Sequence, residues 1–175
     1  MHGDIRTFDI NTLPKGYALV ANIPYYLTGE IFRMFLESEN QPSAMTLLVQ
    51  KEVAERIARS KKESILSLSV KVYGTPKREF VVPRGAFVPA PKVDSAVLTI
   101  REISRKNFST QTEEQRFFAF IRVGFAHKRK FVQKNLKEAG LFAGDTTPSS
   151  KEGSIPEKSR AEDLPLSVWL DLCRA

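Results

Sequence analysis

The sequence predicts an α/β fold followed by a small all-helical segment, and three observations lead to this expectation. Residues 17–21 and 44–50 are short, continuous apolar runs that end at polar residues, as buried parallel strands do. Each run is followed by a stretch in which apolar residues recur at helical spacing. After residue 103 the composition changes, and helical spacing dominates the rest of the chain.

The first apolar run leads into the motif Asn22-Ile23-Pro24-Tyr25-Tyr26. Because Pro24 cannot donate to a sheet ladder, Asn22 is expected at the carboxyl end of a strand, where open α/β sheets bind ligands. The Asn22 side-chain oxygen and the carbonyl of Ile23 or Pro24 are hydrogen-bond acceptors, and Tyr25 offers a flat face. This combination suits a planar amine such as adenine. The alternative is a strand-ending turn whose tyrosines pack in the core.

The other elements of the first part are predicted from caps and spacing. Thr28 and Ser64 are both suitable N-cap residues, and each precedes an apolar stripe. The β-branched residues after Ser64 make a strand the alternative to a helix there. Predicted helices cover residues 29–37, 51–59 and 65–73, predicted strands cover residues 17–21, 44–50, 77–82 and 94–101, and residues 3–5 are expected to end a further strand.

A second motif, residues 87–95, reads Phe-Val-Pro-Ala-Pro-Lys-Val-Asp-Ser. Its alternating prolines stiffen the loop, which suits holding Phe87 in place. Together with the Asn22 motif, it resembles the ribosomal RNA adenine dimethyltransferases, whose nearest relatives are the erythromycin-resistance rRNA methylases. Further matches follow in family order: Gly3-Asp4, Gln50-Lys51-Glu52-Val53, Phe125-Ala126-His127-Lys128-Arg129-Lys130 with Asn135-Leu136, and Arg160-Ala161-Glu162.

The resemblance implies a Rossmann-like methyltransferase that uses S-adenosylmethionine, without a metal, to dimethylate adenine N6 in small-subunit ribosomal RNA. It also implies a cytoplasmic enzyme of ribosome biogenesis that acts on a pre-ribosomal particle, is monomeric when full length and binds no membrane. Tyr25 and Phe87 would clamp a flipped adenine between them. The implied catalytic residues are Asn22, Ile23, Pro24, Tyr25 and Phe87, and the implied cofactor-binding residues are Asp4, Ile5 and Asn22.

One departure from the family concerns the start of the sequence. The family carries a glycine-rich loop and an acidic strand end before its Gly-Asp motif, whereas Gly3-Asp4 here follows Met1-His2 and no G-x-G-x-x-G-like string occurs. We therefore expect the later part of such an enzyme, with the N-terminal strands missing. A catalytically inactive rRNA-binding fragment is one alternative. A DNA adenine methyltransferase is another, although the helical tail and the Phe87 motif favour rRNA. A related mitochondrial transcription factor would share the fold, but its targeting segment is not expected here.

The charge of the chain favours a polyanionic partner, since its formal net charge is +7. A helical pattern covers residues 113–137 and is expected to break near Gly124 or in the basic run that follows. Residues 122–137 contain no acidic side chain, and Phe125 and Phe131 are interleaved with the basic residues. The alternative to RNA contact is a solvated helix face. The predicted RNA-binding residues are Arg122, Lys128, Arg129, Lys130 and Lys134.

Three segments follow: residues 1–103 as the later part of a catalytic domain, residues 104–112 as a linker, and residues 113–175 as a helical RNA-binding domain. Residues 140–154 are expected to be flexible. A single cysteine, Cys173, excludes an intrachain disulfide, and two histidines offer no zinc pattern. No apolar run is long enough for a transmembrane helix. A final helical hairpin is expected at residues 156–175, with a core of Leu164, Leu166, Trp169, Leu170 and Leu172.

Overall fold

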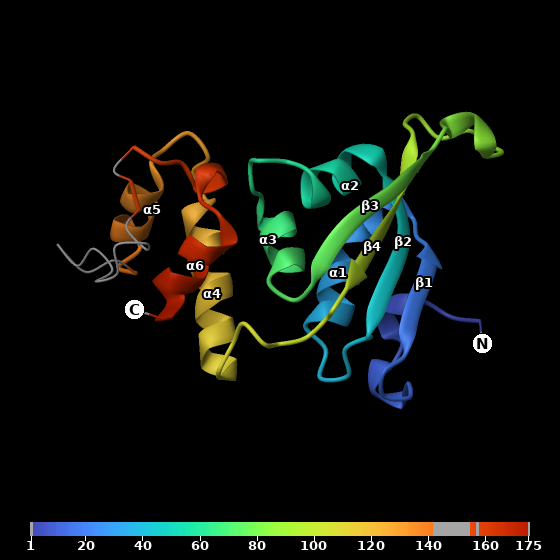
Figure 1. Cartoon of the computed structure of the whole chain (residues 1–175), viewed down its shortest axis with the longest axis horizontal. Helices are drawn as coiled ribbons and strands as arrows, with labels where there is room; N and C mark the ends of the chain where they lie inside the picture. The colour runs from blue at the N-terminus through green and yellow to red at the C-terminus, as the bar shows by residue number, and fades with distance from the viewer. Residues whose placement is uncertain (1, 142–154, 157, 175) are drawn as a thin grey trace. The chain divides into compact units, whose positions relative to one another are not determined.

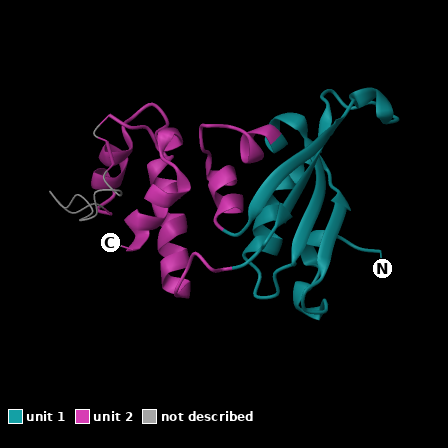
Figure 2. Cartoon of the chain, viewed as in Figure 1, with its two compact units in different colours: residues 1–54, 73–104 teal, residues 55–72, 105–175 magenta. Residues whose placement is uncertain are grey.

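A computed structural model of the chain describes residues 2–141, 155–156 and 158–174. The chain divides into two compact units, residues 1–54 with 73–104, and residues 55–72 with 105–175 (Figure 2). Residues 55–72, which the sequence places with the sheet, thus group with the helical C-terminal part. The assignment of a catalytic and an RNA-binding domain stays a prediction.

The first unit is built on a four-stranded sheet in the order β1-β2-β4-β3 (Figure 1). Strand β1 runs parallel to β2, with Asn22 opposite Leu48, and β4 is antiparallel to both of its neighbours. The α/β class and the four predicted strands are therefore confirmed. The strands are β1 (Ala18–Asn22), β2 (Ala44–Gln50), β3 (Thr75–Val82) and β4 (Ser95–Arg101).

Two expectations about the start of the chain are wrong. No strand ends at residues 3–5, because the Asp4 side chain accepts from the Arg6 backbone N–H and begins a short 3-10 helix, η1 (Ile5–Thr7). Strand β1 is parallel as predicted but not buried, since it is the edge of the sheet and Val20 is 77% exposed. An apolar run shows that a strand is β-prone, but its burial depends on what covers it.

The core of the first unit forms between the sheet and helix α1 (Thr28–Leu36). In β2, burial alternates along the strand, which places Met45, Leu47 and Val49 on the covered face. Tyr17, just before β1, contacts the Phe35 ring edge-on with centroids 6.4 Å apart, which joins α1 to the sheet. Full burial of one large apolar side chain stabilises a fold by about 1.5–3 kcal/mol. The buried stripe of α1 is Ile31, Phe32, Phe35 and Leu36.

Thr28 lies in the first turn of α1 and is not its N-cap. The preceding residues already form a 3-10 turn, η3 (Tyr25–Leu27), in which the Leu27 N–H donates to the Pro24 carbonyl at 2.9 Å. The Thr28 hydroxyl therefore donates back to the Tyr25 carbonyl at 2.8 Å. The helical path begins earlier than the cap residue suggested because Pro24 is followed directly by a turn.

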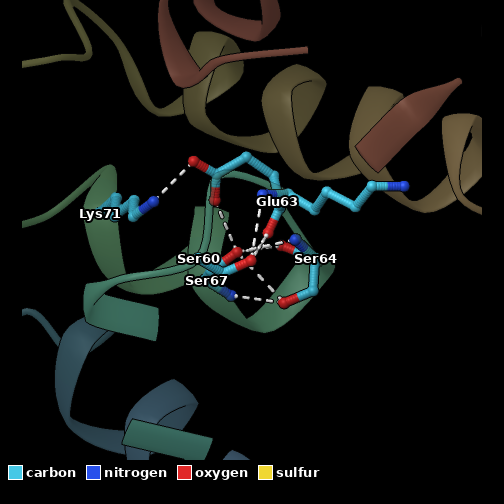
Figure 3. A network of polar contacts seen from close by, with 6 residues as sticks. Ser60, Glu63, Ser64, Ser67 and Lys71 are labelled. Carbon is cyan, nitrogen blue, oxygen red and sulfur yellow. Dashed lines mark hydrogen bonds and ion pairs between the residues drawn. The ribbon is translucent and has the colours of Figure 1, made fainter. Parts of the chain in front are cut away.

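Two short helices follow β2, namely α2 (Lys51–Ala58) and α3 (Ile65–Lys71). The predicted cap of α3 is confirmed, because Ser64 Oγ accepts from the Ser67 N–H at 3.1 Å and Ser67 Oγ accepts from the Ser64 N–H at 2.7 Å. The Glu63 carboxylate accepts from Ser67 Oγ at 2.7 Å and from Lys71 at 2.6 Å (Figure 3). These hydrogen bonds stabilise the start of α3, and residues 65–71 form a helix rather than the alternative strand.

The second unit is helical in its described residues, with α4 (Gln111–Gly124), α5 (Val132–Glu138), the 3-10 turn η5 (Ala161–Asp163) and α6 (Leu166–Arg174). The predicted break at Gly124 is confirmed. A Cβ added there would lie 2.3 Å from the Trp169 ring, and Phe125 stacks on Trp169 at 5.8 Å. Arg174 on α6 pairs with Glu113 on α4 at 2.7 Å. Close packing of α6 on α4 thus requires the glycine.

The C-terminal end differs from the predicted helical hairpin. Among the described residues of this end, α6 is the single α-helix, since η5 is a single 3-10 turn and Pro165 interrupts the chain before α6. Leu166 is half-buried, and the other predicted core residues of this end are buried. Most of the predicted flexible segment, residues 142–154, lies outside the described residues. None of the described helices has the length and apolar character needed to span a bilayer.

Candidate active site

An open pocket of about 350 Å³ lies at the carboxyl end of β1. All five residues predicted to be catalytic line it, together with Leu48 of β2 and two loop prolines. They come from the turn after β1, from β2 and from the loop between β3 and β4, and no lining side chain is charged. The five are Asn22, Ile23, Pro24, Tyr25 and Phe87.

The hydrogen bonds in the turn after β1 distinguish the two candidate backbone acceptors, the carbonyls of Ile23 and Pro24. The Pro24 carbonyl already accepts from the Leu27 N–H at 2.9 Å. The Tyr25 carbonyl likewise accepts from the Thr28 hydroxyl at 2.8 Å. Of the two carbonyls named by the sequence, that of Ile23 is therefore the better acceptor for a ligand amine.

Tyr25 is held from across the sheet by Ser95, a residue to which the sequence assigned no role. The Tyr25 hydroxyl and Ser95 Oγ are 2.7 Å apart. Ser95 is the first residue of β4 and is 0% exposed, so it presents its hydroxyl from a fixed position. Ser95 is the last residue of the Phe87 motif, and this was the signal in the sequence that could have found it.

The loop that carries Phe87 is closed at its base by Asp94. The Asp94 carboxylate accepts from the Arg84 N–H at 3.0 Å, at the start of the 3-10 turn η4 (Arg84–Ala86). The Asp94 carbonyl accepts from the Lys51 N–H at 3.0 Å, at the start of α2. One residue thus ties both ends of the loop and joins it to the neighbouring helix. Phe87 is half-buried at the pocket.

Asp4 and Ile5 lie in the segment that enters η1 and are not among the pocket-lining residues. The Asp4 carboxylate accepts from the Arg6 backbone N–H at 2.9 Å and from its guanidinium at 2.5–3.0 Å. Hydrogen bonding to Arg6 lowers the pKa of Asp4 to about 2. These contacts fill the roughly four acceptor positions of a carboxylate. A ligand could therefore use Asp4 only after the exposed Arg6 side chain moves away.

The basic segment, residues 122–137, presents all five predicted RNA-binding residues to solvent. Two of them are partly neutralised by Glu138, the residue just beyond the segment. Lys130 lies 3.2 Å and Lys134 4.0 Å from the Glu138 carboxylate. Among the described residues, Arg122, Lys128 and Arg129 have no ion-pair partner.

Buried Asn135 shapes the turn between α4 and α5 that carries these cations. Its side-chain amide donates to the Gly124 carbonyl at 2.8 Å and to the His127 carbonyl at 3.3 Å. The Lys130 N–H also donates to the His127 carbonyl, at 2.9 Å. Asn135 thereby fixes the turn on which Lys128 and Arg129 stand. In the described part of the chain, no cluster of three or more His, Cys, Asp or Glu could hold a metal ion.

Comparison with known proteins gives one consistent family. The family model described as ribosomal RNA adenine dimethylase matches residues 1–175. Ribosomal RNA small subunit methyltransferase A of Dehalococcoides mccartyi is 38% identical over 178 residues, covering 99% of this chain and 61% of the relative. Its counterpart from Fusobacterium nucleatum is 35% identical over 173 residues, covering 98% of this chain and 64% of the relative. The chain thus spans less than two-thirds of the length of these curated relatives.

Two solved structures share the fold. A dimethyladenosine transferase from Plasmodium falciparum has a TM-score of 0.76 at 22% identity, covering 98% of this chain and 70% of that chain. The 23S rRNA methyltransferase ErmE has a TM-score of 0.72 at 22% identity, covering 98% of this chain and 68% of that chain. The Rossmann-like class is therefore confirmed. Since the family model matches the whole sequence, as the resemblance predicted, the chain belongs to the ribosomal RNA adenine dimethylase family.

Proposed function

We propose that this chain binds the target adenine in the S-adenosylmethionine-dependent N6-dimethylation of small-subunit ribosomal RNA, on a pre-ribosomal particle in the cytoplasm. One observation carries the proposal: Asn22 and Tyr25, from one turn, line an uncharged pocket at the carboxyl end of β1 together with Phe87, which comes from a loop far along the sequence. An amide oxygen, a backbone carbonyl and two aromatic rings can bind an unpaired adenine through its amine and its faces.

The chemistry follows from the properties of the adenine amine. Its lone pair is delocalised into the ring, so the nitrogen is a poor nucleophile. In the first transfer, Asn22 Oδ1 and the Ile23 carbonyl would accept its two N–H groups and draw the nitrogen toward tetrahedral geometry; in the second transfer, the single remaining N–H would bond to one of them. The same acceptors stabilise the positive charge that develops as the nitrogen attacks, because they are oriented before the reaction begins. No strong general base is required, which agrees with a pocket lined by uncharged side chains.

Tyr25 and Phe87 would hold the flipped base between them. Each ring is fixed by a different contact, Tyr25 by its bond to Ser95 and the Phe87 loop by the Asp94 bond to Arg84. Rings that are held before the base arrives reduce the entropy cost of aligning the amine with the methyl group. The two contacts therefore serve alignment, while Asn22 and Ile23 act on charge.

S-adenosylmethionine supplies the methyl group as a cationic sulfonium when it is bound. The pocket fits this transferring end, because its aromatic faces attract a cation and its Asn22 oxygen lies at the strand end. Asp4 would hold the adenosine end once its carboxylate is released from Arg6. The RNA would be bound through its phosphates by Arg122, Lys128 and Arg129 of the basic segment, which have no ion-pair partner among the described residues.

The test is single-turnover methyl transfer to small-subunit rRNA. It compares the 175-residue chain with a chimera that adds the N-terminal segment of a curated relative. We expect RNA binding by both proteins, and cofactor binding and methyl transfer that depends on Asn22 in the chimera, because the chain holds no glycine-rich string. A chimera that binds both RNA and cofactor but transfers no methyl group would leave only the alternative, rRNA binding without catalysis.

A further inference from the structure

The second unit contains a pocket of about 470 Å³, larger than the candidate active site. It lies where the chain around the start of α3 meets the turn after α4 and the turn η5. Its size falls in the range of small-ligand sites. The proposed methyl-transfer chemistry makes no use of it.

The carboxylates that line this pocket already have partners. Glu63 is held by Lys71 at 2.6 Å and by the Ser67 hydroxyl at 2.7 Å, and Figure 3 shows both contacts. Glu162 is held by Lys62 in an ion pair. Lys128 also lines the pocket, is exposed and has no ion-pair partner among the described residues. The positive charge of Lys128 is therefore available to an anion.

Another part of the lining is apolar. Ile65 is 40% exposed although it is a large aliphatic residue, and Leu66 is half-buried beside it in the sequence. Phe125 also contributes to the lining, and its ring is fixed by stacking on Trp169. An apolar wall and an ammonium group with no ion-pair partner among the described residues match the two parts of a nucleotide, a base and a phosphate.

We infer that this pocket binds one unpaired nucleotide of the RNA, with the base against Ile65 and Leu66 and the phosphate at Lys128. The inference rests on the proposed RNA substrate and adds a second contact point outside the methyl-transfer pocket. RNA is favoured because Lys128 belongs to the basic segment, whose Arg129 is also unpaired among the described residues. A strand bound in the pocket could thus continue along neighbouring cations.

The test measures binding of the 175-residue chain to two RNAs by fluorescence anisotropy. One is a single-stranded oligoadenylate, and the other is a blunt duplex with the same number of phosphates but no unpaired base. Ile65→Ser should lower the affinity for the single strand about fivefold, as expected for the loss of one modest base contact. The affinity for the duplex should stay unchanged. Ile65→Val keeps an apolar surface and serves as the control.

Lys128→Ala should weaken binding of both RNAs and lower the salt slope by about 0.7 to 0.9, the contribution of one phosphate contact. Lys137→Ala, an exposed lysine outside the pocket lining, is the matched control for a change in charge alone. It should leave the ratio of single-strand to duplex affinity unchanged. Lys128 is exposed in a turn, so this variant tests the phosphate contact even if Ile65→Ser fails to fold, and competition then tests the pocket.

Competition separates a nucleotide site from a phosphate site. Adenosine monophosphate should displace the oligoadenylate at lower concentration than inorganic phosphate does. Equal competition, or an Ile65→Ser effect that is absent or equal on both RNAs, would overturn the inference. These readouts involve binding alone, so lost methyl transfer with this pattern intact would count only against the proposed function.

Discussion

The two pockets described above differ in the charge of their lining. The pocket of the first unit is lined by uncharged side chains, whereas the pocket of the second unit is lined by lysine, arginine and glutamate side chains as well as apolar ones. An amine that gains positive charge can be stabilised by oriented hydrogen-bond acceptors, while a phosphate is bound by cations. We therefore expect changes in the first pocket to alter rate and changes in the second to alter RNA affinity.

The largest effect should come from Asn22, because it is proposed to accept from the amine as charge develops. Asn22→Ala should lower the single-turnover methylation rate about a hundredfold, the loss seen when one preorganised polar partner is removed. RNA affinity should change little, since the phosphate contacts are proposed to lie in the second unit. Rapid-quench methyl transfer by the chimera, with anisotropy for RNA binding, measures both quantities.

Asn22→Asp is the informative control for this variant. It keeps an acceptor at the same position and adds a negative charge, so its loss of rate should be smaller than that of Asn22→Ala or comparable to it. If the Asn22→Ala protein is folded and methylates as fast as the protein with Asn22, the proposed mechanism is wrong. It would also contradict the expectation that changes in the pocket of the first unit alter the methylation rate.

The next largest effect concerns the two rings of the clamp. Tyr25→Ala and Phe87→Ala should each remove a stacking face, worth about 1–3 kcal/mol per base. Tyr26→Ala is the matched control, since Tyr26 is 82% exposed and does not line the pocket. We expect methylation to fall for the first two variants and to stay unchanged for the control, in the same single-turnover assay.

The competing interpretation of Tyr25 and Phe87 is that they stabilise the core. It predicts that either alanine variant loses thermal stability and RNA binding together, because the sheet itself would be damaged. Tyr25→Phe separates the two explanations further, since it keeps the ring but removes the bond to Ser95. A reduced rate at unchanged melting temperature would show that ring position matters for the reaction.

The sequence predicted the position of Asn22 at the end of a strand correctly, because the signals for it are local. An apolar run, an asparagine and a proline are enough to place an acceptor at a strand end. The motif points to Ser95, but its contact with Tyr25 was not predicted, because the contact depends on the antiparallel pairing of β4 with β2. The exposure of β1 has a similar cause, since composition does not show what covers a strand.

The sequence located the charged side chains, but it did not predict which of them are already paired within the structure. The basic segment was identified by its lack of acidic residues, but Glu138 directly follows it and pairs with Lys130 and Lys134. In the same way, Arg6 occupies the Asp4 carboxylate from two residues away. Counting residue types in a stretch of sequence gives its net charge. Whether a charged side chain is free to bind a ligand depends on whether the fold places an ion-pair partner beside it.

A further variant tests the packing inside the second unit. Gly124→Ala would place a Cβ 2.3 Å from the Trp169 ring, so we expect a destabilisation of about 1–3 kcal/mol, as for other overpacked cores. Gly29→Ala is the control, because no atom lies within 4 Å of its added Cβ and alanine favours a helix by about 0.5–1 kcal/mol. Urea unfolding measures both changes. Equal stabilities would mean that the packing of Phe125 and Trp169 does not depend on the glycine.

The smallest expected effect is a difference in salt slope between two pairs of cations in the basic segment. Lys128 and Arg129 have no ion-pair partner among the described residues, whereas Lys130 and Lys134 share the Glu138 carboxylate. Replacing Lys128 and Arg129 together with alanine should lower the salt slope of RNA binding by about 0.7 to 0.9 per contact. Replacing Lys130 and Lys134 should lower it less, because each must first leave Glu138 before it binds a phosphate. These are exposed ion pairs, worth at most about 1 kcal/mol, so the difference is modest and requires a full salt titration.

Glu138→Gln provides the internal check on this last comparison. With the carboxylate removed, Lys130 and Lys134 become as available as Lys128 and Arg129, so the salt slope should steepen and the two double variants should then lose similar amounts. If Glu138→Gln leaves the slope unchanged while the Lys128 and Arg129 variant still flattens it, the second pair does not contact RNA. If none of the variants changes the slope, the basic segment is a solvated helix face, and the affinity of this chain for RNA must come from another surface.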